Sequence, residues 1–325
     1  MKLAREALLI VLAAVLGTAP AVAEQYPARP ITLIIPFAAG GPSMALIRIM
    51  EPALTKALGQ RLIIENVSGG SGAIGTGRLA RAAPDGYTIG LGQWDNLVLN
   101  GAISSLPYDL KSDFAPIALF ATNPQLIVAR KDLPAANLPE LIGWLGAHPD
   151  KAVQGTAGPG SAAHVSGAYF QSVTSTHFAF APYRGAGPAM QDLVAGHIDL
   201  MFDQAGNALP HVREGNIRAY AVTAKTRLAA APDIPTVDEA GLPGFYVSIW
   251  RGLWAPKGTP PDVIARLNGA VVSALEDPTV RQRLGDLGQQ IPSLGEQTPT
   301  ALGALQRAEI EKWWPLIKAA GIKVE

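Results

Sequence analysis

The sequence contains no cysteine, which excludes disulfide bonds and thiol chemistry. Charge is also scarce, because only 16% of the residues are charged and the 26 basic residues balance the 26 acidic ones. Without a basic surplus, the chain lacks the electrostatic face of a nucleic-acid-binding protein or of a polybasic membrane-surface protein. The histidines His148, His177, His197 and His211 show no metal-ligand spacing. We therefore expect no metal, no cofactor and no nucleic-acid partner.

Long apolar runs are confined to the beginning of the chain, where Ala7 to Leu16 is too short to span a bilayer as a helix. This run follows Lys2 and Arg5 and precedes the A-x-A sequence that ends at Ala23. The order is typical of a secretory signal peptide, so we expect residues 1–23 to be removed and the mature protein to be soluble and periplasmic. The mature chain then exceeds a usual domain of ~100–200 residues, which favours two lobes.

The stretch after this signal combines a strand, a loop of small residues and a helix. Ile31 to Phe37 is apolar and rich in β-branched residues, as in a strand buried on both faces. Ala38 to Pro42 follows as an uncharged loop, and Ser43 stands at the position of an N-cap before an apolar helical series. In open α/β sheets, helix N-termini of this kind hold anions through backbone N–H groups, without Arg or Lys. The alternative is an ordinary strand-to-helix corner without a ligand.

The same unit recurs at Arg61 to Ala83 and at Val153 to Val173. In the first recurrence, Gly70 to Gly75 matches G-x-G-x-x-G, but Val67 to Gly69 separate this match from the strand. Close backbone packing is therefore favoured over dinucleotide binding. In the second recurrence, the loop is Gly158 to Ser161, with a sequence of Gly-Pro-Gly-Ser.

The recurrences lie on both sides of an apparent crossover between two lobes. Phe114 to Arg130 holds two apolar runs, and we interpret the second run as a strand that enters a new lobe. Ile217 to Val222 is interpreted as the strand that crosses back. These interpretations predict a first lobe of residues 24–124 and 223–325 and a second lobe of residues 125–222. Glycine-rich loops in both lobes suggest two sets of helix N-termini around one cleft that closes by hinge motion.

Four polar or aromatic side chains are further candidates for ligand contact. Trp94 and Asp95 follow an apolar strand, where they form either a ligand contact, with Trp94 as an apolar wall and Asp95 as a hydrogen-bonding group, or a surface loop. His164 stands in the first turn of a helix and contacts either the ligand or the loop backbone. Asp203 ends an alternating strand, where it lies near the cleft or caps the next helix.

Six motifs follow one another along the chain: YPARPITLIIPFAAGGP, the glycine loop before PDGYT, GPGSAAH, PYRGAGPAMQDLVAGHIDLMFD, IPTVDEAGLPG and GLWAPKGTPPDVIARLN. The ordered set resembles the periplasmic solute-binding receptors of tripartite tricarboxylate transporters, the Bug receptors of Bordetella and its relatives. Each motif alone is modest, but their common order is specific. The resemblance covers essentially all of the chain after residue 23.

The resemblance implies an α/β fold of the periplasmic binding protein type (type II-like), with two lobes, a hinge and mixed sheets flanked by helices. It implies a receptor that holds a small carboxylate largely through backbone amides and bridging waters, and we expect this receptor to be a monomer. Its partners are then this organic acid and the membrane permease subunits of a tripartite transporter. Carried over by motif, the ligand-binding positions are Phe37, Ala38, Ala39, Gly40, Gly41, Ser43, Trp94, Asp95, Gly158, Gly160, Ser161, His164, Tyr183, Arg184, Gly185 and Asp203.

Two positions depart from the family pattern. The first loop of the family continues G-G-x-x-D, whereas this chain has Met44 in place of the acid, with Ser43 available as a substitute cap. Trp94 also places a bulky aromatic where small polar residues are expected. Together, these departures suggest a more apolar or aromatic acid than the family usually binds.

Two classes of function compete for this sequence. The favoured class is a binding protein that delivers an organic acid to a permease, or reports it to a membrane sensor kinase. The other class is a secreted α/β hydrolase, which should carry G-x-S-x-G at a nucleophile elbow. Ser161 lies in G-P-G-S-A-A and Ser71 lies in G-G-S-G-A, so neither serine fits. We therefore expect no enzymatic activity.

Overall fold

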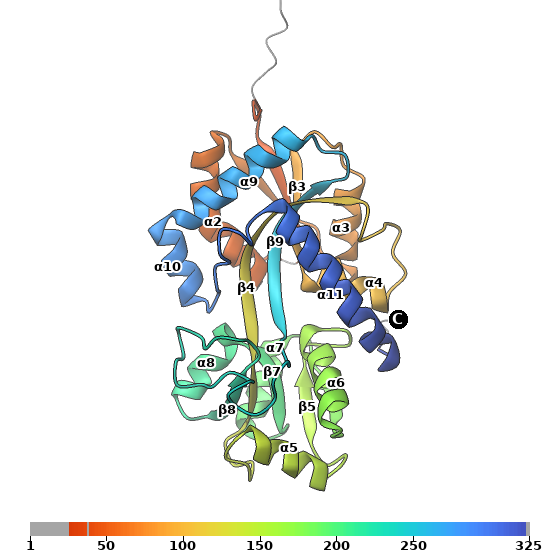
Figure 1. Cartoon of the computed structure of the whole chain (residues 1–325), viewed down its shortest axis with the longest axis vertical. Helices are drawn as coiled ribbons and strands as arrows, with labels where there is room; N and C mark the ends of the chain where they lie inside the picture. Colours follow the sequence, from red (N-terminus) through yellow and green to blue (C-terminus); the bar gives the residue numbers. More distant parts are fainter. Residues whose placement is uncertain (1–25, 38, 323–325) are drawn as a thin grey trace, which may run out of the picture.

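The computed structural model describes residues 26–37 and 39–322. The expected signal peptide and the candidate residue Ala38 therefore lie outside the described residues. Within them, the chain forms two lobes that are joined by the long strands β4 (Phe114–Arg130) and β9 (Ser248–Pro256) (Figure 1). Helices flank the sheet in both lobes, and the sheet mixes parallel and antiparallel pairs. The predicted α/β class with mixed sheets is confirmed.

The first lobe is built on three parallel strands and their crossover helices: β1 (Ile31–Ile35), α2 (Pro42–Leu58), β2 (Leu62–Asn66), α3 (Ala73–Ala80) and β3 (Thr88–Gln93). The strands pair in the order β2-β1-β3, and β9 lies antiparallel to β3. Leu33 and Ile34 are both buried although successive side chains of a strand point to opposite faces. The apolar run therefore forms the two-sided strand that the sequence predicts.

The strand β4 joins the two lobes because it exchanges partners along its length. It is one continuous strand of 17 residues rather than two separate runs. From Phe114 to Pro124 it pairs with β9, and from Gln125 onward it pairs with β7 (Leu200–Gln204) and β8 (Ile217–Val222). The lobes are therefore parts of one continuous nine-stranded sheet.

The strand that returns to the first lobe is β9, and not β8 (Ile217–Val222). Ile217 to Val222 does form a strand, as predicted, but it pairs with the second part of β4. Residues 223–247 then fold back on β8, since Val237 donates to the Val222 carbonyl and Val247 donates to the Thr223 carbonyl. The interpretation of β8 as the crossing strand is therefore wrong.

The second lobe alternates strands and helices: α5 (Leu138–Ala147), β5 (Val153–Thr156), α6 (Ala162–Thr174), β6 (Ala179–Pro182), α7 (Ala186–Ala195), β7 (Leu200–Gln204) and α8 (Ala205–Arg213). The strand β5 is parallel to β6 and to β7, whereas β7 is antiparallel to β4. Parallel strands place the following helices with their N-termini at one edge of the sheet.

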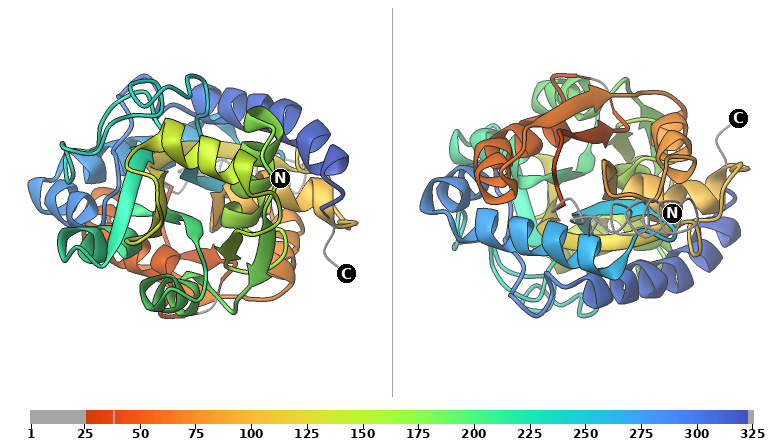
Figure 2. Two further views of the ribbon diagram at one scale, coloured as in Figure 1. Left: turned by 90° about the horizontal axis from the view of Figure 1, so that it is seen from below. Right: turned by 90° about the horizontal axis from the view of Figure 1, so that it is seen from above.

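The remaining helices cover the first lobe: α4 (Asn100–Ile103), α9 (Pro261–Glu276), α10 (Pro278–Asp286) and α11 (Pro299–Ala319), with short turns at Gly70–Gly72 and Asp95–Leu99. The C-terminal helices, in blue, lie along one side of the molecule when it is seen along its long axis (Figure 2). Helix α9 packs on α2, and α11 packs on β4.

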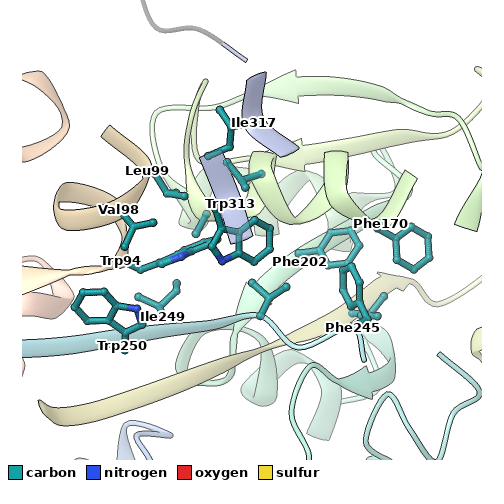
Figure 3. Close-up of a cluster of buried hydrophobic side chains, with 14 of the residues drawn as sticks. Trp94, Val98, Leu99, Phe170, Phe202, Phe245, Ile249, Trp250, Trp313 and Ile317 are labelled. Atoms are coloured by element: carbon teal, nitrogen blue, oxygen red, sulfur yellow. The ribbon is translucent and has the colours of Figure 1, made fainter. Parts of the chain in front are cut away.

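A cluster of aromatic side chains joins α11 to both lobes (Figure 3). Trp313 of α11 meets Trp94 edge to face, with 4.9 Å between ring centroids, and meets Tyr169 of α6 at 5.1 Å. Trp94 is 0% exposed. Its ring is therefore part of the core, and the expectation that it forms an apolar wall for the ligand is wrong.

We expect Trp94→Ala to lower the free energy of unfolding by ~3–5 kcal/mol, because it removes a large buried ring and leaves a cavity. Chemical denaturation followed by tryptophan fluorescence and circular dichroism would measure this loss. Leu294→Ala is the control, since Leu294 is 63% exposed and its replacement should change stability by less than ~0.5 kcal/mol. Equal effects of the two substitutions would contradict the placement of Trp94 in the core.

Candidate functional site

A cavity of about 210 Å³ lies where four helices begin. Its lining includes the first residues or N-cap of α2, α6, α7 and α8, namely Gly41, Pro42, Ser43, Ser161, Ala162, Ala163, Ala186 and Gln204. The first N–H groups of a helix have no partner within the helix, and the helix dipole makes this end electropositive. The cavity is therefore suited to a negatively charged group.

A second, wider cavity of about 500 Å³ adjoins the first. The two share Gly41, Pro42, Ala186, Asp203 and Gln204, so they form one continuous cleft. The wider part extends to the segment after α10 and to the middle of β4, and its further lining includes Asn123, Leu287 and Gln289. The cleft therefore lies between elements of both lobes.

Arg251 brings a buried positive charge to the smaller cavity. It belongs to β9 and is 2% exposed. Its guanidinium donates to the Gln289 side-chain oxygen at 3.3 Å and to the Gln204 side-chain oxygen at 3.2 Å, while its Nε has no hydrogen-bond partner among the described residues. Burial lowers the pKa of Arg251 to about 10. A buried guanidinium whose hydrogen-bond partners are neutral is suited to bind an anion.

Asp95 lines the same cavity from the turn that follows β3. Burial raises the pKa of the Asp95 carboxyl, and the nearby charge of Arg251 opposes this shift. The carboxylate accepts from the Gln93 side-chain nitrogen at 2.8 Å, and the Gln93 oxygen in turn accepts from the Ser43 hydroxyl at 2.9 Å. Helix α2 begins at Pro42 with Gly41 as N-cap. Ser43 is therefore a link in this chain of hydrogen bonds and not the predicted cap.

Asp203 lines the cleft from the second lobe, at the end of β7. Its carboxylate accepts from the Gln204 backbone N–H and from the Asn207 side chain. Burial raises the pKa of Asp203 to about 6, and these two hydrogen bonds partly oppose the shift. Gln204 is the N-cap of α8, so Asp203 takes the cleft position rather than the cap position of the two alternatives.

The structure brings together about half of the residues that the sequence analysis selected. The smaller cavity is lined by Phe37, Gly41, Ser43, Asp95, Ser161 and Asp203, and the wider one adds Gly40. Neither cavity is lined by Ala39, Trp94, Gly158, Gly160, His164, Tyr183, Arg184 or Gly185. Nothing is described for Ala38.

Local contacts explain why several selected residues lie outside the cavities. The Nδ1 atom of His164 accepts from the Gly160 backbone N–H at 3.1 Å, and burial lowers the pKa of this imidazole. His164 therefore serves the loop backbone, one of its two predicted roles. The Tyr183 hydroxyl donates to Asp192 at 2.6 Å, and Arg184 is exposed.

The sequence analysis missed Arg251, Gln204, Gln289 and Gln125, of which all but Gln289 line the smaller cavity. One signal was present for Arg251, because it is the only charged residue in the otherwise apolar run SIWRGLWAP. A charge in the middle of a buried strand requires a partner, and that requirement points to a site.

Within residues 26–37 and 39–322, no group of three or more His, Cys, Asp or Glu side chains is placed to hold a metal ion. In the same residues, no helix has both the length and the apolar character needed to cross a membrane.

Known proteins of one family share both the sequence and this fold. The sequence profile of the tripartite tricarboxylate transporter family receptor matches residues 46–322. The protein BugT of Bordetella pertussis strain Tohama I is 33% identical over 309 residues, which cover 94% of each chain.

Three solved structures extend the comparison. MatC from Rhodopseudomonas palustris with bound malate has 39% identity and a TM-score of 0.77, over 90% of this chain and 100% of that one. The periplasmic binding protein BugD has 37% identity and a TM-score of 0.77, over 92% and 100%. A second R. palustris protein, solved with adipate, has 31% identity and a TM-score of 0.79, over 92% and 99%.

The family and these structural relatives are solute-binding receptors rather than enzymes, and the two-lobed periplasmic binding fold is shared. The chain therefore belongs to the tripartite tricarboxylate transporter receptor family, as a periplasmic solute-binding protein of the Bug type.

Proposed function

We propose that this protein captures a small organic acid in the cleft between its lobes and delivers it, as a monomer, to the permease of a tripartite tricarboxylate-type transporter. One observation carries the proposal: four helix N-termini and the buried guanidinium of Arg251 converge on a single cavity. Together they supply the positive potential and the N–H donors that a carboxylate requires. The malate and adipate bound by two relatives support this choice.

The lining also supports a small ligand group at the end of the cleft where Arg251 lies. This smaller cavity measures about 210 Å³, and it opens into the wider part of about 500 Å³. Its apolar surface comes from Phe37, Phe202 and Ile249, of which the last two also belong to the aromatic and apolar cluster of Figure 3. The ligand that we propose therefore pairs a carboxylate with a short apolar or weakly polar body. Trp94 gives no support for a large aromatic acid, because its ring is buried in the core.

We further propose that the two lobes close over the ligand by bending where β4 exchanges partners, at Pro124 and Gln125. The expected first lobe of residues 24–124 and 223–325 then moves against the expected second lobe of residues 125–222. The folding of residues 223–247 on β8 supports extending the second lobe to Val247. At the mouth of the cleft, Gly206 of α8 faces the backbone of Leu287, which follows α10 in the first lobe.

Export is the third part of the proposal. Bug-type receptors are periplasmic binding proteins, and we propose that residues 1–23 direct this chain to the periplasm and are removed after Ala23.

N-terminal sequencing of the protein exported by a Gram-negative host should therefore begin at Glu24, because A-x-A sequences are signal peptidase sites. A mutant with Ala21→Arg and Ala23→Arg should retain the leader and stay in the membrane fraction. A soluble cytoplasmic protein that still begins at Met1 would contradict the proposed export.

The binding function is tested by calorimetry and by ligand-dependent melting against a panel of malate, succinate, adipate, glutarate and benzoate, with product analysis beside it. At least one acid should bind and remain chemically unchanged. Arg251→Gln should lower the affinity for this acid at least about tenfold, since a hydrogen bond to a charged group contributes ~1.5–3 kcal/mol.

Two further variants test whether binding depends on residues that line the cleft rather than on residues outside it. Gly41→Val should also weaken binding while the protein stays folded, because Gly41 lines the cleft and its φ of −79° is open to valine. Arg184→Ala should leave affinity unchanged, because Arg184 is exposed and lines neither cavity. Loss of binding in Arg184→Ala with full binding in Arg251→Gln would contradict this site.

Closure is tested by small-angle scattering with and without the tightest acid of the panel. The wild-type protein should become more compact at saturation. Gly206→Val should reduce this compaction, because even a Cβ at position 206 would lie 3.2 Å from the Leu287 carbonyl oxygen. Gly269→Val is the matched control, since Gly269 lies in α9 with nothing within 4 Å of a built Cβ. An unchanged wild-type profile at saturation would count against closure.

A further inference from the structure

Asp95 is a feature of the cleft that carboxylate binding alone does not explain. It lines the same cavity as Arg251, and Gln93, which pairs with Arg251 across β3 and β9, donates to the Asp95 carboxylate. Asp95 itself lies just past the end of β3, at the start of the helical turn that follows the strand. The cavity therefore presents a positive and a negative side chain next to each other.

The two charges are close enough to influence each other but do not form an ion pair. The ion pairs within 4.0 Å among the described residues do not include Asp95 with Arg251. Arg251 is held instead by the neutral side chains of Gln204 and Gln289. Opposite charges in a poorly solvated site normally meet, so a gap between them inside a cavity suggests that a ligand completes the pairing.

The hydrogen bonds of Gln93 support the same conclusion. Its amide nitrogen donates to Oδ2 of Asp95, while its oxygen accepts from Ser43. This arrangement fixes the orientation of the carboxylate, and no other side-chain donor reaches Asp95 within the described residues. Asp203, by comparison, has a protein donor on each of its oxygens. Asp95 is therefore the acid of the cleft with capacity for a further hydrogen-bond donor.

We infer that the ligand is a zwitterion, a carboxylate that also carries an ammonium group close to it. Arg251 and the helix N-termini bind the carboxylate, and Asp95 binds the ammonium. A purely anionic ligand would bring its charge beside Asp95, where like charges repel in a poorly solvated cavity. This inference rests on the proposed function, since it specifies the acid that the same cleft captures.

The test uses pairs of acids that differ by one amino group: propionate with L-alanine, succinate with L-aspartate, glutarate with L-glutamate, and 3-phenylpropionate with L-phenylalanine. Calorimetry of the wild-type protein at neutral pH should show that the amino member of the best-binding pair binds at least tenfold tighter. This comparison needs no variant and therefore does not depend on how a substitution affects folding.

Asp95→Asn then assigns the ammonium site. The substitution should lower the affinity for the amino acid at least tenfold. The affinity for the plain acid should stay the same or rise, so that the preference for the amino acid disappears. Asp233→Asn is the control, because Asp233 is exposed and lines neither cavity, and it should keep the wild-type preference. Circular dichroism and thermal melting establish that both variants are folded.

The possible failures are distinguishable. A plain acid that binds as tightly as its amino counterpart would overturn the zwitterion while the proposed carboxylate receptor stands. A preference for the amino acid that persists in Asp95→Asn would overturn the role of Asp95 and with it this inference. If none of the eight compounds binds, the proposed function fails, and the inference fails with it.

Discussion

The partner exchange of β4 is the constraint on which the cleft depends. Up to Pro124 this strand pairs with β9, and from Gln125 it pairs with β7 and β8. One continuous strand thus joins two sets of parallel strands, each with helices that start at one edge of its sheet. The N-termini of α2 from the first lobe and of α6, α7 and α8 from the second line the same cavity as a consequence. The site therefore follows from chain topology before any particular side chain is considered.

Arg251 adds a side-chain charge to this backbone framework and couples the charge to the position of the lobes. Its guanidinium reaches Gln289 in the first lobe and Gln204 at the start of α8 in the second. Both contacts are long hydrogen bonds to neutral oxygens, which compensate poorly for the removal of a charge from water. An anion in the cavity would provide the missing compensation. Since a ligand shifts a conformational equilibrium only through its differential contacts with the two states, this residue is suited to favour the closed arrangement.

Hydrophobic periodicity and turn residues predicted most of the strands and helices. They did not predict how the strands pair between the lobes, nor every residue of the site. The apolar run from Ile31 forms the buried strand β1, and the loop Gly158 to Ser161 leads into helix α6, as the sequence pattern indicates. The strand order across the lobes could not be derived, because the pairing of β4 with β9 joins residues more than 120 positions apart and depends on no local signal. At the site, the loop interpretation placed both Trp94 and Asp95 at the ligand, but the chain turns into a helix directly after β3, so that Trp94 enters the core while Asp95 lines the cavity. Arg251 escaped detection because its neighbours in the strand are apolar and no motif marks it.

Backbone groups and side chains have different roles in the cleft, and this difference explains how one fold can bind different acids. Helix N-termini attract any carboxylate, because they act through backbone groups that do not depend on side-chain identity. Two relatives with 39% and 31% identity were solved with malate and with adipate, so the shared architecture admits acids of different length. Discrimination must then come from the side chains that complete the wall, since a fold does not by itself define a ligand. In this chain the wall contributes Arg251, Asp95 and the glutamines that hold them. A polar group that is buried without a partner carries a desolvation penalty. Such a wall therefore selects against ligands that lack the matching group, as well as for ligands that have it.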